Sequence, residues 1–364
     1  MYYNAVVPKD DCSDGENAGG SAVVSRSNPQ QSGEAQLYET LRSMLRGGHL
    51  LQAINASVAL AIPDLLRDGP MSSDAIAAKT QTHPPSVYRL LRALAAAGLF
   101  VEDGDRRFAL TPLGTLLRSD VPISLSATAR HVASERHSKT WANLIHSVRT
   151  GEPGRRHAPW DSQMFAEDPE YAASFAQRMT EAASQRAAAA IAGYDFSGIA
   201  TLVDVGGGHG RLLASILQTY PHMRGMLFDL PQVLGGAERL LEAAGVSDRC
   251  QRIGGSFFDA VPEGGDAYLM SVVIHDWDDA RAATILENCR AAVGTAGRVL
   301  LLERVISDTH SLDDTLADLE MLVGPGGRER TREEFRSLLA GAGFELSRII
   351  PLAFSYNIVE GVPA

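Results

Sequence analysis

Cysteines, aromatic residues and long apolar runs are scarce in this chain of 364 residues. Its three cysteines, Cys12, Cys250 and Cys289, stand far apart, so neither a disulfide framework nor a cysteine metal cluster is expected. A reducing cytoplasm is therefore the expected compartment. No apolar run approaches the length of a membrane span, and the first residues lack the basic and apolar regions of a signal peptide.

The chain also has no excess of positive charge. Its 33 Lys and Arg residues face 44 Asp and Glu residues, which gives a formal net charge of −11. This balance argues against general electrostatic binding to nucleic acid or to an anionic membrane. The length leaves room for a large core and for two domains.

A glycine-rich segment, TLVDVGGGHG at 201–210, is the most informative stretch. A buried strand that ends in such a turn and opens a helix exposes backbone N–H groups where a ligand can approach closely. A dinucleotide fingerprint that began at Gly206 and Gly208 would need a small residue at position 211. The chain has Arg211 there, which argues against that cofactor.

The spacing Asp204-x-Gly206-x-Gly208-x-Gly210 instead resembles the S-adenosylmethionine (SAM) turn of class I methyltransferases. SAM carries no phosphate, so the turn needs no basic anchor. Asp229 closes the next expected strand, where a carboxylate can accept hydrogen bonds from both ribose hydroxyls. The bland alternative is a tight turn between a strand and a helix, and Asp229 makes that alternative less favourable.

The first 34 residues differ in composition from the rest. Residues 1–34 are rich in Ser, Gly, Asn, Asp and Gln and show no apolar period, so a disordered tail is expected. A helical apolar pattern follows over 36–62, with an interruption at Gly47 and Gly48. So much apolar surface is explained by burial within one chain or by a subunit interface, and we favour the interface.

Residues 35–120 are expected to form a winged-helix dimerisation domain, with a break at Pro84-Pro85. The expected helices and hairpin strands are 73–79, 86–97, 99–101 and 108–110. In a DNA-binding winged helix the outward face of the second helix would be basic. Here that face offers only Arg89 and Arg92, so a DNA-binding metabolite sensor is kept as a distant alternative.

Residues 121–195 are expected to be a helical linker that contributes to a substrate pocket, with helices at 124–150 and 169–192. Phe175 and Met179 share one face of the second helix. Such a pair is more often part of a core, but a ring and a thioether would also suit a flat aromatic ligand.

From residue 196 to residue 364 the pattern alternates between strands and helices. Alternation of this kind predicts a parallel sheet wound on both faces, with ligands at the carboxyl ends of the strands. The expected strands are 201–205, 225–229, 250–253, 267–274, 298–304, 345–350 and 354–360. The expected helices are 210–218, 232–244, 279–293 and 331–342.

Candidate catalytic side chains follow two expected strands. Strand 267–274 runs into His275 and Trp277, and Glu303 closes the next strand. Glu329 lies in a Gly-rich loop before a helix whose expected cap is Thr331. A single histidine after a strand is usually solvated or part of a core. Two carboxylates near one imidazole would instead fix its tautomer and stabilise the imidazolium after proton abstraction.

The motifs DVGGGHG, DLP, HDWDD and PGGRERT, behind a winged helix, resemble those of the plant caffeic-acid-type O-methyltransferases and their bacterial relatives in aromatic secondary metabolism. The resemblance covers roughly residues 36–362. It implies that His275 is the general base for a phenolic hydroxyl, bracketed by Glu303 and Glu329. It also implies an intertwined homodimer whose partner chain helps to close the substrate pocket.

The motifs and the resemblance together define the expected contacts. Those with SAM are Asp204, Gly206, Gly208, Asp229, Leu230, Ser256, Phe257, Phe258 and Ser271, and those with the substrate are Phe175, Met179, Trp277 and Met321. The chain departs from the family in three places. Ser256 replaces an Asp near the adenine, Ser271 replaces a Lys, and Val323 or Gly324 replaces an Asn.

The sequence therefore predicts a SAM-dependent methyltransferase that acts on a hydroxyl of a small aromatic metabolite. The expected fold is α/β, a class I methyltransferase Rossmann-like sheet behind an N-terminal, mainly helical winged-helix dimerisation domain. No metal, nucleic acid or membrane is expected as a partner. The alternative on the same fold is N-methylation of a heteroaromatic compound or non-methylating SAM chemistry.

Overall fold

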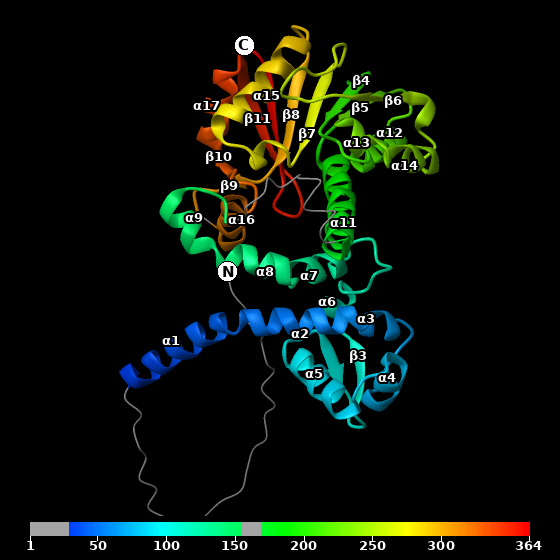
Figure 1. The fold of residues 1–364 in the computed structure, drawn as a ribbon, viewed down its shortest axis with the longest axis vertical. Helices are drawn as coiled ribbons and strands as arrows, with labels where there is room; N and C mark the ends of the chain where they lie inside the picture. The colour runs from blue at the N-terminus through cyan, green and yellow to red at the C-terminus, as the bar shows by residue number, and fades with distance from the viewer. Residues whose placement is uncertain (1–28, 155–168, 310) are drawn as a thin grey trace, which may run out of the picture. The chain divides into compact units, whose positions relative to one another are not determined.

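The computed structural model describes residues 29–154, 169–309 and 311–364, drawn as the coloured ribbon of Figure 1. Contacts divide the chain into two units, Met1–His49 and Leu50–Ala364. The expected tail lies outside the described residues up to position 28. It was expected to extend to residue 34, which is wrong, because helix α1 (Pro29–Leu45) already begins at Pro29.

Helix α1 carries a row of exposed apolar side chains. Leu37, Leu41 and Leu45 are 72%, 59% and 75% exposed, and Tyr38 and Met44 are exposed as well. A break at Arg46 separates α1 from helix α2 (Gly47–Ala59), so Gly47 and Gly48, which were expected to interrupt the helix, instead open α2. The apolar row thus remains available for a partner surface.

The predicted order of helix, turn, helix and hairpin is confirmed in the second unit. The elements are α3 (Ile62–Leu65), β1 (Met71–Ser72), α4 (Ser73–Thr80), α5 (Pro84–Ala96), β2 (Phe100–Glu102), β3 (Arg107–Leu110) and α6 (Pro112–Thr115). The strands pair in the order β1-β3-β2 around the buried Leu91, Leu94 and Phe108. Pro84 opens α5 rather than breaking the chain before it, because proline fits the first helical position, where no N–H is needed.

The single helix expected over 124–150 is wrong. The structure has three short helices, α7 (Ser126–Val132), α8 (Glu135–Ala142) and α9 (Leu144–Thr150). Ser134 accounts for one break, because its side chain accepts a hydrogen bond from the N–H of His137 and so caps a new helix. The second expected helix is confirmed as α11 (Pro169–Gly193).

A seven-stranded sheet in the order β11-β12-β8-β7-β4-β5-β6 forms the centre of the C-terminal part of the chain. The strands are β4 (Thr201–Val205), β5 (Arg224–Asp229), β6 (Cys250–Gly254), β7 (Ala267–Ser271), β8 (Arg298–Glu303), β11 (Phe344–Pro351) and β12 (Asn357–Pro363). The five strands from β6 to β8 pair in parallel, and β12 is antiparallel to both of its neighbours.

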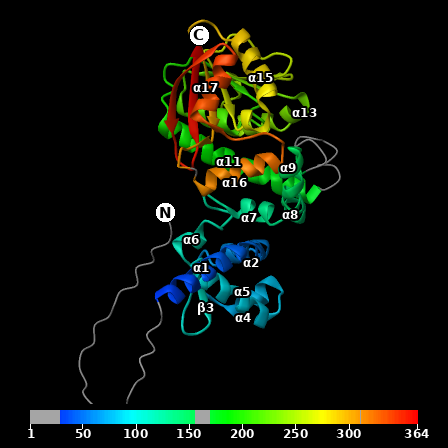
Figure 2. The same cartoon turned by 90° about the vertical axis from the view of Figure 1, so that its left-hand side faces the viewer.

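Helices cover both faces of this sheet (Figures 1 and 2). Alternate residues of the strands face two separate cores. Leu202 and Leu269 pack with α11 and with α12 (Arg211–Thr219), whereas Val203 and Tyr268 pack with α15 (Asp279–Ala292) and α17 (Arg332–Gly341). The predicted doubly covered parallel sheet is therefore confirmed, with β11 and β12 as its antiparallel extension.

Four details of the expected pattern are corrected. The helix at 232–244 is divided into α13 (Pro231–Leu234) and α14 (Ala237–Ala243), followed by the short turn η1 (Ser247–Arg249). Helix α16 (Leu312–Val323) and the short parallel pair of β9 (Val305–Ile306) and β10 (Arg330–Thr331) were not predicted. The last strand begins at Asn357 rather than 354, because Phe354 and Ser355 have positive φ and form a turn.

The fourth correction concerns β7, which was expected to reach residue 274 and ends at Ser271. Val272 has φ +52°, a conformation that a β-branched residue rarely adopts, and it turns the backbone out of the sheet. The N–H groups of Val273 and Ile274 then donate to a side chain of β8 instead of to a neighbouring strand. Strain of this kind is characteristic of functional sites.

Candidate active site

The glycine-rich turn lies at the carboxyl end of β4. Gly206, Gly208 and Gly210 have φ of +71°, +60° and +80°, which favours glycine at each of these positions. The N–H of Gly206 donates to the carbonyl of Phe228 on β5. A Cβ added at Gly208 would meet no atom within 4 Å, so the space beside the turn is open to a ligand.

Asp229 faces this turn from the end of β5. Its carboxylate accepts hydrogen bonds from the N–H of Gly208 at 2.8 Å and from the N–H of Leu230 at 2.7 Å. Burial raises the pKa of Asp229, and the two N–H groups oppose that shift. The carboxylate is thus fixed at the turn, as an acceptor for the hydroxyls of a ribose must be.

Asp204 lies beneath the turn in β4 and is 1% exposed. Its carboxylate makes no well-formed hydrogen bond within the described residues. Burial, reinforced by the negative charge of Asp229, raises the pKa of Asp204 to about 7, whereas Arg186 favours the charged form. Three predicted cofactor contacts, at 204, 208 and 229, are therefore brought together.

An aromatic cluster lies on the other side of the turn. The rings of Phe257 and Phe258 are 4.9 Å apart, and the ring of Trp277 is 6.1 Å and 4.8 Å from them. Phe257 lies close to Gly206, since a Cβ built there would be 3.5 Å from its ring. Ser256 accepts a hydrogen bond from the N–H of Phe258 and so turns toward its own backbone. Trp277, predicted to contact substrate, thus packs with residues predicted to contact the cofactor.

His275 is the centre of the second cluster. It belongs to the turn η2 (Ile274–Asp276), and its Nδ1 lies 2.9 Å from Glu329 Oε1 and 3.7 Å from Glu303 Oε2. The two glutamates are 2% and 0% exposed. Its Nε2 is 3.7 Å from Asp276, a neighbour that the sequence analysis did not assign to the site. The predicted trio of His275, Glu303 and Glu329 is therefore brought together.

Each glutamate is held from a different direction. Glu303 Oε1 accepts hydrogen bonds from the N–H groups of Val273 and Ile274 at 3.0 and 2.8 Å, so it anchors the turn that carries His275. Glu329 immediately precedes β10, whose parallel pairing with β9 brings it beside the chain that leaves Glu303. Glu303 Oε2 and Glu329 Oε2 are buried without a hydrogen bond in the described part of the chain.

The charges of this trio shift two pKa values. Burial by itself disfavours the imidazolium, but the carboxylates of Glu329 and Glu303 outweigh it and raise the pKa of His275 to about 10. Burial raises the pKa of Glu303 to about 7, although His275 opposes that shift. The two carboxylates thus make His275 a stronger base than a free imidazole.

Arg330 holds the backbone around the histidine and was missed in the sequence. It is 1% exposed and donates to the carbonyls of Ile274 and Trp277 and to the carboxylate of Asp279. The backbone at Gly327 also lies close to the backbone of the histidine, because a Cβ at Gly327 would be 2.0 Å from the carbonyl oxygen of His275. The motif PGGRERT therefore positions the histidine as well as supplying Glu329.

A group of rings and one carboxylate lies among α7, α8, α11 and α16. Phe175 is 5.5 Å from the ring of His131, which is 5.4 Å from the ring of His137. Trp141 donates its indole N–H to Glu320 at 2.7 Å. The sequence analysis singled out Phe175 alone among these residues, although His131 and His137 already stood in one expected helix. Met179 and Met321 are half-buried on α11 and α16.

The trio could also hold a divalent cation by distance alone, because one ligand atom from each residue lies within 4.8 Å of the others. The expectation that no metal is needed remains a prediction.

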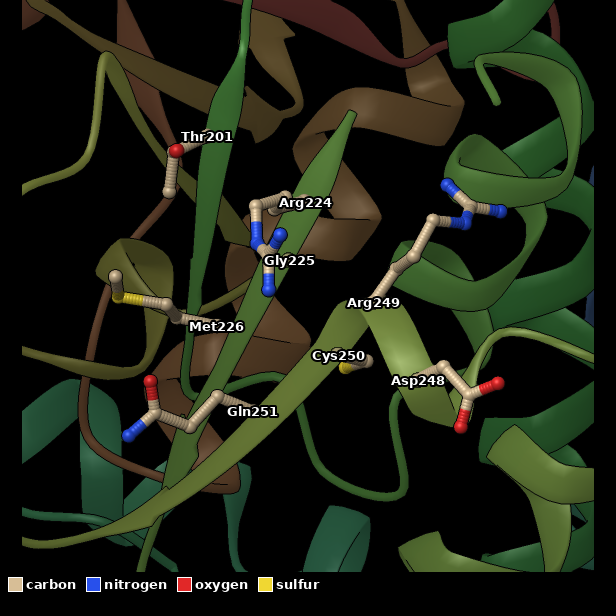
Figure 3. Close-up of a pocket in the computed structure, with 8 residues that line it drawn as sticks. All are labelled: Thr201, Arg224, Gly225, Met226, Asp248, Arg249, Cys250 and Gln251. Atoms are coloured by element: carbon tan, nitrogen blue, oxygen red, sulfur yellow. The ribbon is translucent and has the colours of Figure 1, made fainter. Parts of the chain in front are cut away.

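A separate cavity of about 300 Å³ lies at the amino ends of β4, β5 and β6, where Thr201, Arg224 and Cys250 line it (Figure 3). It is at the edge of the sheet opposite the glycine turn. Among the described residues, no helix is both long and apolar enough to cross a membrane.

Comparisons with known proteins agree with this geometry. The O-methyltransferase domain model matches residues 141–345, and the O-methyltransferase dimerisation domain model matches residues 43–120. The chain is 38% identical to a phenazine O-methyltransferase of Lysobacter antibioticus over 336 residues, which are 92% of this chain and 98% of that protein.

Solved structures show the same likeness. The mitomycin 7-O-methyltransferase has a TM-score of 0.82 at 36% identity, with coverage of 92% of this chain and all of that one. An O-methyltransferase of neocarzinostatin biosynthesis, solved with SAM and 2-hydroxy-5-methyl naphthoic acid, has a TM-score of 0.70 at 34% identity, with coverage of 86% and 96%.

The glycine turn gives a direct binding prediction. Gly208→Val should weaken binding of S-adenosylhomocysteine (SAH) at least about 100-fold, because a branched side chain would fill the open space and resist the positive φ. Isothermal calorimetry measures this. Gly245→Val is the matched control, since Gly245 has a φ of +68° and a Cβ there also meets nothing within 4 Å. Equal affinities of Gly208→Val and the wild type would remove the turn from the site.

Proposed function

The chain belongs to the O-methyltransferase family, and on that premise we propose that it methylates a hydroxyl of a small, flat aromatic metabolite with His275 as the general base. The observation that carries this proposal is the 2.9 Å contact between His275 Nδ1 and Glu329, with Glu303 buried beside it. The contact leaves Nε2 as the nitrogen that takes the proton from the acceptor.

The pKa of the base suits a phenol. An unperturbed phenol has a pKa of about 10, which matches the pKa of about 10 of His275. A proton transfer between groups of equal pKa costs little free energy once the imidazole is neutral, and the neutral form of His275 becomes more abundant as the pH rises toward 10. The two buried glutamates then stabilise the imidazolium that forms.

The described residues fit SAM as the cofactor of this family. The open side of Gly208 gives room for it, the fixed carboxylate of Asp229 suits its ribose, and the ring of Phe257 beside Gly206 suits its adenine. When bound, SAM supplies a methyl group on an electrophilic sulfonium. The protein must orient the acceptor oxygen toward that group and remove one proton. Leu230, Ser256, Phe258 and Ser271 complete the proposed cofactor contacts.

The acceptor is proposed to bind among the rings described above. Phe175 and Met179 lie on one face of α11, and Met321 follows Glu320 on α16. Rings and thioethers suit a flat aromatic molecule, and Glu320 and the two histidines offer polar contacts. Trp277 would contact both the acceptor and the cofactor region.

Two alternative reactions on this fold, N-methylation and non-methylating SAM chemistry, need no proton removal from a phenol. Mass spectrometry of a panel of phenols, quinones and N-heteroaromatics, with and without EDTA, separates these reactions and tests for a metal.

We also propose that two copies of the chain form a homodimer through α1 and α2. The exposed apolar row on α1 and the match to a dimerisation domain support this. Neither the composition nor the outward face of α5 favours a nucleic-acid partner.

The acceptor series tests the base. His275→Ala should leave SAH affinity almost unchanged and lower kcat by about 10²- to 10⁴-fold for the least acidic phenol. The loss should shrink as the pKa of the acceptor falls, because an acidic phenol ionises in water without help. Steady-state kinetics across phenols of graded acidity measure this trend. A kcat ratio near one for the least acidic phenol would show that His275 is structural.

The pH profile tests the carboxylates. The base must be neutral to act, so kcat/KM should rise with pH from about 6 toward the pKa of about 10 of His275. Glu329→Gln removes the largest charge that raises this pKa, and its profile should level off at a lower pH. The same acceptor is used for both proteins, so that ionisation of the phenol is common to them. Superimposable profiles would contradict the proposed role of Glu329.

The dimer has its own test. Leu41→Asp should dissociate the dimer at micromolar concentration, because it places a charge within the apolar row. Ser43→Asp is the matched control on the opposite side of α1 and should leave the dimer intact. Removal of residues 1–28 should have no effect either. Light scattering that gave one monomer mass for the wild type would contradict the proposed interface.

A further inference from the structure

Arg186 is a buried guanidinium without an ion-pair partner among the residues that the structure describes. It lies on α11 and is 5% exposed. Its Nε donates to Ser271 Oγ at 2.9 Å, and its guanidinium carbon lies 5.8 Å from the centre of the Tyr356 ring. Arginines are almost never fully buried unless they are paired, because desolvation of the charge is costly. An anionic ligand would supply the partner.

The position of Arg186 identifies which ligand that is. Asp204 on β4 pairs in register with Leu269 on β7, and Ser271 ends β7 at the same carboxyl edge of the sheet as the glycine turn that follows β4. Arg186 thus reaches the edge of the cofactor turn through Ser271. It is also close enough to Asp204 to favour the charged form of that carboxyl.

The charges around the turn point to the same conclusion. Asp204 and Asp229 are both acidic, which suits the ammonium and sulfonium groups of SAM but repels its α-carboxylate. We propose that Arg186 binds the α-carboxylate of SAM and SAH. Ser271 holds Nε, so the two terminal nitrogens of the guanidinium remain available for a bidentate contact. The proposal rests on the cofactor of the family and is independent of the acceptor and of His275.

Calorimetry with two ligands tests this contact. SAH and decarboxylated SAH differ by the α-carboxylate alone. The wild type should bind SAH about 10- to 100-fold more tightly than the decarboxylated compound, as expected for a buried charge-assisted contact. Arg186→Met should lose that preference and bind both ligands with similar affinity. Arg186→Lys should keep part of it.

The control variant removes Arg304, a second arginine that lies over the ring of Tyr356. Arg304 lies over Tyr356 at 5.5 Å and pairs with Asp313, and Arg304→Met should retain the full preference for SAH. Equal affinities of the wild type for the two ligands would overturn the proposal, whether or not any variant folds. An Arg186→Met protein that keeps the preference but loses affinity for 1-naphthoate would overturn it as well, because the carboxylate would then belong to the acceptor. A loss of methyl transfer with intact ligand preference would affect the proposed function alone.

Discussion

The contact of His275 with two buried carboxylates is the interaction on which the rest of the site depends. Burial of three ionisable groups is costly unless they share charge, and a protonated imidazole beside two carboxylates does this. The surrounding chain fixes their geometry. Val272 leaves the sheet with a positive φ, Glu303 receives the two N–H groups that follow, and Arg330 binds the carbonyls on either side of the histidine. These contacts hold the backbone of the turn, so the imidazole has little freedom to leave Glu329.

The cofactor edge shows the opposite arrangement of charge. There two acids, Asp204 and Asp229, lie on adjacent strands, and Arg186 on α11 is close enough to Asp204 to favour its charged form. A zwitterionic ligand with an added sulfonium fits such a distribution, since both signs of charge find a partner. The base and the cofactor turn are thus separated in chemistry although β4 and β7 are neighbours in the sheet.

Sequence reasoning reached the site because its residues follow strands. Carboxyl ends of parallel strands share one edge, so Gly206, Asp229, His275 and Glu303 could be placed together from their spacing alone. The end of β7 could not be placed from the sequence. An apolar run does not reveal that the backbone leaves the sheet at Val272 and that the next two N–H groups donate to Glu303 of β8. Arg330 and Arg186 were missed for a related reason. Each acts through partners dozens of residues away in the chain, and an isolated arginine in a helix or a loop gives no local signal.

The helices that carry the proposed acceptor pocket were the least predictable from the sequence. A continuous apolar period suggested one helix over 124–150, but Ser134 competes for backbone N–H groups and starts a new one. Helix α16 was missed although its cap, Ser311, accepts from the N–H of Asp314. These short helices carry His131, His137, Trp141 and Glu320, which are the proposed walls of the acceptor pocket.

The division between sheet and helices has a functional consequence. The proposed base, its glutamates and the glycine turn are fixed by strand register and by backbone contacts, so a change in any of them would disturb the others. The proposed acceptor walls come instead from helices outside the sheet, where Trp141 of α8 donates to Glu320 of α16. Substitutions at Trp141 or Met321 are therefore expected to change which aromatic molecule fits without displacing His275. A fold built in this way keeps one reaction while its acceptor varies.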